Sequence, residues 1–274
     1  MTAEYTSGGS RLKYVQQGAG TPVVFLHPTP LNHAYWLPVL AELPGVRAIA
    51  PDLRGHGASE MGELPVGGFA RVPDASVLTM ERLAEDALAL LDTLKLESAV
   101  FAGCSIGGYV LLELWRRAPE RMSGLAFICS KPQPDAEAGL VKRVENIARI
   151  RREGAEGFFD TMANTLPGVT TRERNPKLVS AVRSQMTLSR EGVVAVQAGL
   201  AVRPDSVPTV ATIRVPVLSI AGGEDGSVSP AEMEAFAAAP GGCTSHVLRD
   251  AGHLAAFEQP DRVGELLRNW LHGL

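Results

Sequence analysis

Short apolar runs alternate with amphipathic stretches along most of the chain. The runs cover residues 22–26, 46–50, 124–129, 215–221 and 244–248, and one more ends just before Gly103. Runs of this length predict strands covered on both faces, whereas the alternating stretch at 11–18 predicts an edge strand. Helical spacing over 80–95, 230–239 and 260–272 predicts helices laid on the sheet. We therefore predict an α/β fold with a mostly parallel sheet and helices on both faces.

The alternation stops after about residue 131 and resumes after about residue 208. The intervening stretch has no buried-strand run, and its apolar residues instead keep helical spacing around 137–153, 155–165, 176–187 and 190–201. A structureless loop of this length is uncommon in a compact domain. We therefore predict a core formed by 1–132 and 209–274, with a helical cap over 133–208 inserted into it.

Composition narrows the class of protein. The chain has 274 residues, 45% of them hydrophobic, and a net charge of −4, which fits one globular domain and indicates neither nucleic acid nor an anionic membrane as partner. No apolar run has the length of a membrane span, and the N-terminus lacks a secretory signal. The cysteines, Cys104, Cys129 and Cys243, suggest neither a disulfide framework nor a zinc site. We expect a cytoplasmic protein without cofactor or metal. Whether it forms a homodimer is left open by the sequence.

The first chemical signal is the segment Gly103-Cys104-Ser105-Ile106-Gly107, which lies between an apolar strand and an apolar helix. It fits the pattern G-x-S-x-G, in which a serine sits on a sharp turn above the end of a sheet. Side chains at the two glycine positions would collide across such a turn. An ordinary glycine–serine loop is the alternative, but the strand–turn–helix setting favours Ser105 as a nucleophile.

A serine hydroxyl needs a base to take its proton and an acid to orient that base. Asp225 follows the strand at 215–221, and His253 follows the strand at 244–248, so both should lie with Ser105 at the carboxyl edge of the sheet. Glu224 and Asp250 are the alternative acids. Asp225 is favoured because it lies deeper in its turn, whereas Asp250 is so close to His253 that it would cap the local turn.

The negative charge that develops on a carbonyl oxygen needs two fixed N–H donors. Ile106, directly after the nucleophile, should supply one. The loop after the strand at 22–26 should supply the other, and Pro28 and Pro30 have no N–H. We select Thr29 as that donor, and we expect His27 to anchor the loop.

Together these segments make nearly all of residues 20–272 resemble the α/β-hydrolase superfamily. The matching motifs are those at 26–30, 51–57, 103–108, 222–225 and 252–260. The resemblance implies a catalytic triad of Ser105, Asp225 and His253 and an oxyanion hole from the N–H groups of Thr29 and Ile106. One departure is Pro28, where the family commonly has glycine. The stretches 142–154 and 178–186 are most similar to 3-oxoadipate enol-lactonase-like hydrolases and to carboxylesterases.

The predicted activity is hydrolysis of a small-molecule carboxylic ester or lactone through an acyl-enzyme on Ser105. Perhydrolases and carbon–carbon bond hydrolases keep the same triad and stay as alternatives. Epoxide hydrolases and haloalkane dehalogenases resemble this fold but need a carboxylate where Ser105 stands. A hydrolase-like receptor that binds a ligand without catalysis is the alternative from another class.

The substrate pocket is the least defined part of the prediction. Its candidate lining residues are His27, Trp36, Phe158, Met162 and Leu254, although Phe158 and Met162 also suit packing within the cap. A basic cluster in the cap invites a carboxylate-bearing substrate; its members are Lys142, Arg143, Arg149, Arg151 and Arg152. A solvated helix face is the favoured interpretation of that cluster, because charged runs usually lie outside.

Overall fold

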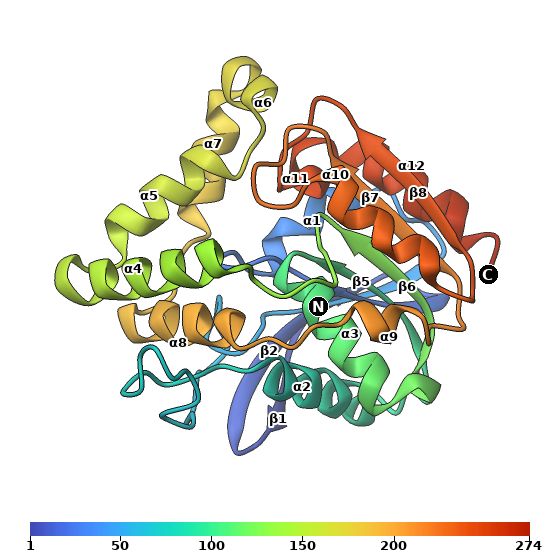
Figure 1. The fold of residues 1–274 in the computed structure, drawn as a ribbon. Coiled ribbons are helices and arrows are strands. Elements are labelled where there is room, and N and C mark those ends of the chain that lie inside the picture. The colour runs from blue at the N-terminus through green and yellow to red at the C-terminus, as the bar shows by residue number, and fades with distance from the viewer.

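The computed structural model describes residues 1–274 and contains one eight-stranded sheet with helices on both faces (Figure 1). The strands lie in the order β1-β2-β4-β3-β5-β6-β7-β8. Their bounds are β1 Thr2–Ser7, β2 Ser10–Gln17, β3 Thr21–Leu26, β4 Val46–Pro51, β5 Ala99–Cys104, β6 Met122–Ile128, β7 Val217–Gly222 and β8 Cys243–Leu248. The six strands β4, β3, β5, β6, β7 and β8 pair in parallel. β2 pairs antiparallel with both β4 and β1. The predicted fold class is confirmed.

The edge of the sheet differs from the prediction. The stretch at 11–18 was expected at the edge, but β2 lies between β4 and an additional strand, β1, which forms the edge. Only Tyr5 and Ser7 of β1 are buried. A strand with so few buried positions has little apolar pattern, which explains why the sequence did not reveal it.

Helices cover the two faces of the sheet. On one face, α2 (Met80–Thr93) packs beside α3 (Ile106–Arg117), and on the other α1 (Leu37–Leu40) packs beside α12 (Pro260–Leu271). The predicted helix at 230–239 is divided into α10 (Pro230–Met233) and the 3-10 turn η3 (Glu234–Ala238). None of the helices combines the length and the apolar character that crossing a bilayer requires.

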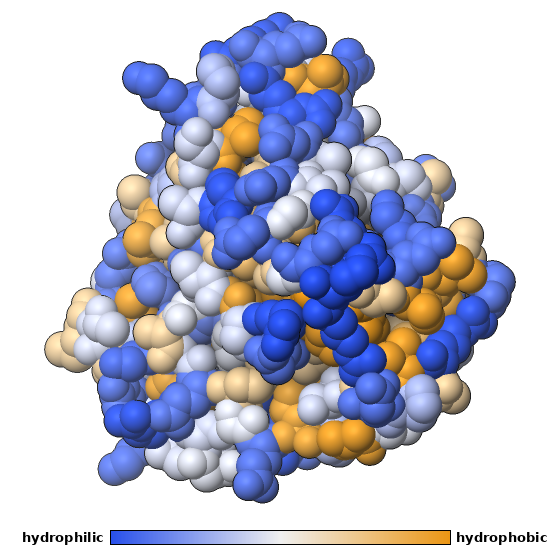
Figure 2. All heavy atoms as spheres, turned by 90° about the vertical axis from the view of Figure 1, so that its left-hand side faces the viewer, coloured by the Kyte–Doolittle hydropathy of each residue, from blue (hydrophilic) through white to orange (hydrophobic).

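A helical segment connects β6 to β7 and extends to one side of the sheet (Figure 1). It contains α4 (Glu137–Glu153), α5 (Glu156–Thr165), α6 (Val169–Arg174), α7 (Pro176–Ser184), α8 (Arg190–Ala201) and α9 (Val207–Val210). The short helices α6 and α9 were not predicted, since each is too short for a helical period to show. Figure 2 looks onto this side and shows strongly hydrophilic side chains near the centre and the top of the face, with scattered hydrophobic ones.

The helical segment contacts the rest of the molecule very closely at α8. The N–H of Leu78, just before α2, donates to the carbonyl of Ala195 at 3.0 Å. A Cβ atom added at Gly199 would lie 1.7 Å from the carbonyl oxygen of Leu78. Only glycine allows this approach, so α8 lies directly against the loop that leads into α2.

Candidate active site

Ser105 lies at the turn between β5 and α3, in the middle of the sheet. Its backbone has φ 53° and ψ −118°, a conformation that residues other than glycine rarely adopt. A Cβ on Gly103 would lie 2.5 Å from the carbonyl carbon of Gly107, and one on Gly107 would lie 2.3 Å from the carbonyl oxygen of Leu26. The two glycines therefore permit the strained turn that the motif predicts.

Neighbouring strands hold this turn in place. The N–H of Ser105 donates to the carbonyl of Ile128 at 3.1 Å, and its carbonyl accepts from the hydroxyl of Ser130 at 2.9 Å. Ile106 is the first residue of α3, so its N–H has no carbonyl one turn earlier in that helix. The arrangement presents the Ser105 hydroxyl next to a helix N-terminus, where negative charge is stabilised.

His253 and Asp225 form a buried pair beside this turn. The Nδ1 of His253 lies 2.7 Å from Oδ2 of Asp225. The other carboxylate oxygen accepts the N–H groups of Ser227 at 2.7 Å and Val228 at 3.0 Å. Because Asp225 occupies Nδ1, the Nε2 of His253 is the nitrogen that can receive a proton from a hydroxyl in the cavity.

The two alternative acids have other partners. Glu224 accepts from the N–H of Thr170 at 2.8 Å and from its hydroxyl at 2.5 Å. Asp250 is exposed and lies 3.8 Å from Arg174. Neither carboxylate contacts His253, so Asp225 is the one of the three candidate acids that pairs with it.

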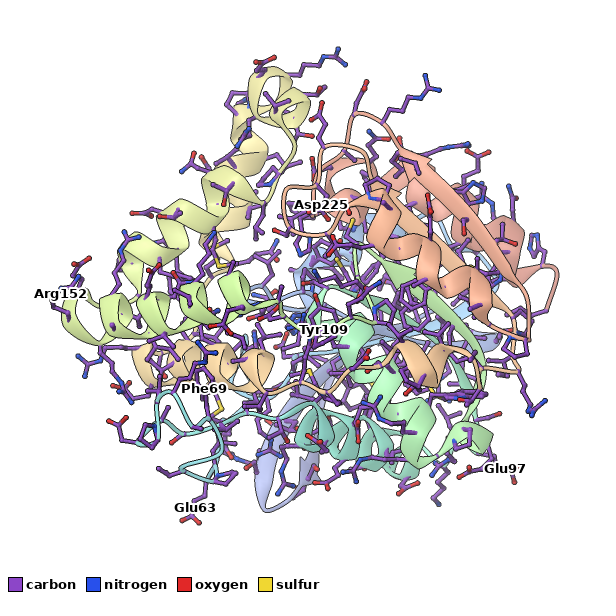
Figure 3. All side chains as sticks on the ribbon, viewed as in Figure 1. Glu63, Phe69, Glu97, Tyr109, Arg152 and Asp225 are labelled. Carbon is purple, nitrogen blue, oxygen red and sulfur yellow. The ribbon has the colours of Figure 1, made fainter.

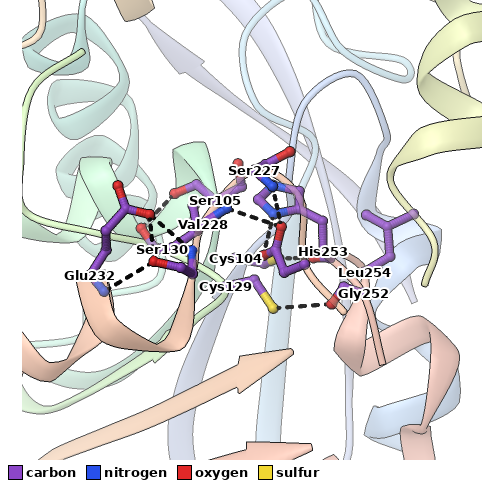
Figure 4. A network of polar contacts seen from close by, with 12 residues as sticks. Cys104, Ser105, Cys129, Ser130, Ser227, Val228, Glu232, Gly252, His253 and Leu254 are labelled. Carbon is purple, nitrogen blue, oxygen red and sulfur yellow. Dashed lines mark hydrogen bonds and ion pairs between the residues drawn. The ribbon is translucent and has the colours of Figure 1, made fainter. Parts of the chain in front are cut away.

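The two cysteines near the turn are packed inside. Burial raises the pKa of the Cys104 thiol and that of the Cys129 thiol, so both stay protonated. Cys104 donates to the carbonyl of His253 at 3.7 Å, and Cys129 donates to that of Gly252 at 3.5 Å (Figure 4). They therefore support the loop of His253 from below, as small apolar residues with a weak donor.

Thr29 and Ser105 both line a cavity of about 120 Å³. Its N–H donates to no acceptor within the protein, which leaves it free for a ligand. Its hydroxyl lies 2.9 Å from Nε2 of His56, and Nδ1 of His56 lies 2.9 Å from the carbonyl of Arg54. Burial lowers the pKa of His56 to about 3, so the ring is neutral, donates to that carbonyl and accepts from Thr29. His56 thus anchors the loop that carries the Thr29 N–H.

Three residues expected in the substrate pocket lie elsewhere. His27 is fully buried, and its Nε2 accepts from the N–H of Leu53 at 2.9 Å. Trp36 packs against Phe25, and Leu254 is completely buried. None of the three lines the cavity at Ser105 or the pocket outside it. The expectation is corrected because closeness in sequence to Thr29 or His253 does not expose a side chain to the cavity. His27 instead anchors its loop, as expected.

Ser105 and His253 line a cavity of about 120 Å³ between the sheet edge and the helical segment. Its other lining residues are Thr29, Tyr109, Lys131, Asp135, Arg143, Met162, Leu166, Gln197, Leu200, Ser227 and Val228. A second pocket of about 320 Å³ shares Asp135, Arg143, Met162, Leu166, Gln197 and Ser227 with it. Met162 lines both spaces, whereas Phe158 lines only the outer pocket. The shared residues make the outer pocket the approach to Ser105.

The chain is similar to known proteins in both sequence and structure. A sequence model of the alpha/beta hydrolase family matches residues 23–266. The chain belongs to this family. Among its relatives within the family, 3-oxoadipate enol-lactonase 1 of Acinetobacter baylyi is 26% identical over 257 residues, which cover 92% of this chain and 89% of that protein.

Two further similar proteins are named for activities other than enol-lactone hydrolysis. One is a thermophilic esterase from Thermogutta terrifontis, whose structure was solved with malate bound. It is 32% identical to this chain, and the two structures superpose with a TM-score of 0.89 over 100% of this chain and 98% of the esterase chain. A Mycobacterium tuberculosis protein named as a non-heme bromoperoxidase is 29% identical over 263 residues, which cover 92% of this chain and 94% of that protein. The expected resemblance to enol-lactonases and esterases is confirmed.

Several residues of this alpha/beta hydrolase site escaped the sequence analysis. Tyr109 lies on α3, Lys131 and Asp135 lie in the loop between β6 and α4, and Gln197 lies on α8, so these residues meet only at the cavity. No local pattern marks them, since each suits an ordinary helix or loop. No three His, Cys, Asp or Glu side chains are grouped closely enough to hold a metal ion.

Glu258 is a further residue whose role was not visible in the sequence. Its carboxylate accepts the N–H groups of Gly252 at 3.0 Å and Leu254 at 3.1 Å, on either side of His253. It also accepts the N–H of Gly168 at 2.8 Å and the hydroxyl of Thr171 at 2.6 Å, both in the helical segment. Glu258 therefore joins the loop of His253 to α6.

Proposed function

We propose that this protein is a serine hydrolase that cleaves a carboxylic ester or lactone. The observation that carries the proposal is the buried His253–Asp225 pair beside Ser105, in one cavity with the free N–H of Thr29. A base oriented by an acid, a serine on a strained turn and unpaired N–H donors are the parts that acyl transfer requires.

In the proposed reaction, Nε2 of His253 takes the proton of the Ser105 hydroxyl as Oγ attacks the substrate carbonyl. The N–H groups of Thr29 and Ile106 stabilise the resulting oxyanion, and Asp225 stabilises the protonated imidazole. His253 then gives the proton to the leaving alcohol, which stays attached to the acyl group if the substrate is a lactone. Water, deprotonated by His253, attacks the acyl-enzyme and releases the acid.

We also propose that residues 133–208 act as a cap that shapes the substrate pocket. Arg143, Met162 and Gln197 belong to this stretch and line the cavity together with Ser105, which supports the proposal. A cap of this kind excludes water and selects substrates by its lining. The predicted cytoplasmic location and the open possibility of a homodimer stay predictions.

The enol-lactonase and esterase relatives support ester and lactone substrates for this chain. The relative named as a bromoperoxidase supports perhydrolysis as a second activity of the same serine, in which hydrogen peroxide replaces water in the attack on the acyl-enzyme. The peracid formed would oxidise bromide, so a peroxide-dependent bromination assay with acetate distinguishes this activity from hydrolysis. Carbon–carbon bond hydrolysis and ligand binding without catalysis stay as the alternatives predicted from the sequence.

The test is the rate of hydrolysis of short-chain para-nitrophenyl esters and of simple lactones by the parent protein and Ser105→Ala. We expect the variant to lose at least about a thousandfold in kcat/KM. Ser184→Ala is the matched control, because that hydroxyl is exposed and bonds only to the carbonyl of Ala181. Equal rates for the parent and Ser105→Ala would exclude the proposed mechanism.

A further inference from the structure

Arg143 and Lys131 are the two cations on the wall of the cavity that contains Ser105, and Lys131 is paired with Glu232 at 2.5 Å. The Nε of Arg143 lies 3.0 Å from Oδ2 of Asp135, and its Nη1 donates to Oε1 of Gln197 at 3.1 Å. Its Nη2 donates to no acceptor in the protein, and about a quarter of the side chain is exposed. The guanidinium is thus held by two partners while its remaining nitrogen is free for a ligand.

Gln197 adds a second donor at this position. It is almost completely buried on α8, and it lines both the cavity and the outer pocket. Its carbonyl oxygen accepts from Arg143 and, at 3.4 Å, from Asn146. The orientation of the amide is therefore set, and its nitrogen has no partner within the protein. An amide nitrogen that has no partner within the protein, on a residue that lines a cavity, can donate to an acceptor on a ligand.

The charges around Arg143 do not balance. Asp135 also pairs with Arg203, whose Nη2 lies 2.8 Å from Oδ1. Burial opposes the ionisation of Asp135, but the guanidinium groups of Arg143 and Arg203 outweigh it and keep the pKa of this carboxyl below its usual value. Two guanidinium cations therefore share one carboxylate, so Asp135 alone does not neutralise Arg143. An anionic group on the ligand would supply the second negative partner for the two guanidinium groups.

The structure divides the basic cluster of the sequence into two groups. Lys142, Arg143 and Arg149 line the outer pocket, and Lys142 forms no ion pair. Arg152 lies at the far end of α4 and points away from the molecule, while Tyr109 lies centrally (Figure 3). Arg152 pairs with the adjacent Glu153 at 2.7 Å. A solvated helix face, which the sequence favoured for the whole cluster, does not describe Arg143, which Asp135 and Gln197 hold at the cavity.

We infer that the substrate carries a carboxylate in addition to the bond that is cleaved, and that Nη2 of Arg143 and Nε2 of Gln197 bind it. This inference rests on the proposed ester or lactone hydrolysis. Lys142 and Arg149 at the outer pocket would attract the anion before it reaches the cavity. Arg143 thus determines specificity, and Asp135 positions it.

The experiment compares two para-nitrophenyl esters of similar shape that differ at one end, where one has an anionic group and the other an apolar group. One is the mono ester of adipate, which ends in a carboxylate, and the other is a neutral ester of the same chain length that ends in an isopropyl group. We expect the parent protein to prefer the adipate ester in kcat/KM. In Arg143→Gln, the ratio of the two kcat/KM values should fall about ten- to a hundredfold, because a hydrogen bond to a charged group is lost.

Two more variants keep the test falsifiable. Arg152→Gln, on the same helix but outside both spaces, should leave the ratio as in the parent. Arg143→Lys keeps the charge without the planar guanidinium and should give an intermediate ratio. A parent that prefers the neutral ester, or a ratio that Arg143→Gln and Arg152→Gln change equally, would overturn the inference. Failure of the proposed hydrolysis would be distinct, since neither ester would then be cleaved by any of the proteins.

Discussion

Glu258 joins the loop that carries His253 to the helical segment. We predict that Glu258→Gln lowers both the stability of the fold and the rate of ester hydrolysis. One carboxylate oxygen accepts the N–H of Leu254, the other accepts from Gly168 and Thr171, and both accept from the N–H of Gly252 at 3.0 Å. A glutamine at this position keeps the shape of the side chain but replaces one acceptor by an NH₂ donor. Because every partner is a donor, one pair of them must face that NH₂.

The size of the effect follows from these contacts. If the amide oxygen stays on the His253 side, the Thr171 hydroxyl can rotate to accept, but the N–H of Gly168 loses its acceptor. An unsatisfied, partly buried N–H costs about 1–3 kcal/mol, and the remaining bonds lose the strengthening by charge, about another 1 kcal/mol. We therefore expect a loss of about 2–4 kcal/mol in the free energy of unfolding, or roughly 5–15 °C in Tm.

The assay is thermal unfolding, with ester hydrolysis measured on the same samples. We expect kcat/KM to fall together with Tm, because the loop of His253 is no longer held on both sides. Glu265→Gln is the matched control, since Glu265 is half-exposed and pairs only with Arg262. The reasoning would be refuted by a Glu258→Gln protein whose Tm and kcat/KM equal those of Glu265→Gln.

Three other changes test separate parts of the structure. Asp225→Asn should lower kcat by about a thousandfold or more with little change in Tm, because the amide favours the wrong tautomer of His253; kinetics and unfolding on one preparation check this. Burial lowers the pKa of His27 to about 4 and that of His56 to about 3. The unfolded chain therefore binds more protons below pH 6.5, and urea unfolding should show stability falling from there towards pH 4; a flat profile would contradict these shifts. Gly199→Ala should destabilise by at least about 2 kcal/mol, because its Cβ would overlap the carbonyl of Leu78, whereas Gly273→Ala, with 3.4 Å to its nearest neighbour, should not.

Local patterns were sufficient where the chemistry depends on neighbouring residues. Gly103 and Gly107 mark the strained turn because the backbone there leaves no room for a Cβ. The order of strands along the chain placed Asp225 and His253 at one edge of the sheet, and their contact at 2.7 Å agrees with that placement. Glu224 and Asp225 are adjacent in the turn after β7. In the structure the residue deeper in that turn, Asp225, is the one that contacts His253.

Local patterns failed where a role depends on partners distant in the chain. Arg143 and Arg152 lie on the same helix and look alike in sequence, but Asp135 and Gln197 hold only Arg143 at the cavity. Trp36 follows the loop of Thr29 directly, yet its ring packs into the core. Such differences arise from tertiary packing, which the spacing of apolar residues does not encode.

Covalent labelling with a fluorophosphonate tests the assignment of Ser105 most directly, because this reagent forms a stable bond only to an activated serine. Mass spectrometry of the intact folded protein, followed by peptide mapping, identifies the modified residue. We expect one adduct per chain, on Ser105, with much slower labelling of Asp225→Asn and none of Ser105→Ala at that position. A folded parent protein that gains no adduct, or that carries the adduct on another residue, would contradict the assignment of Ser105 as the nucleophile.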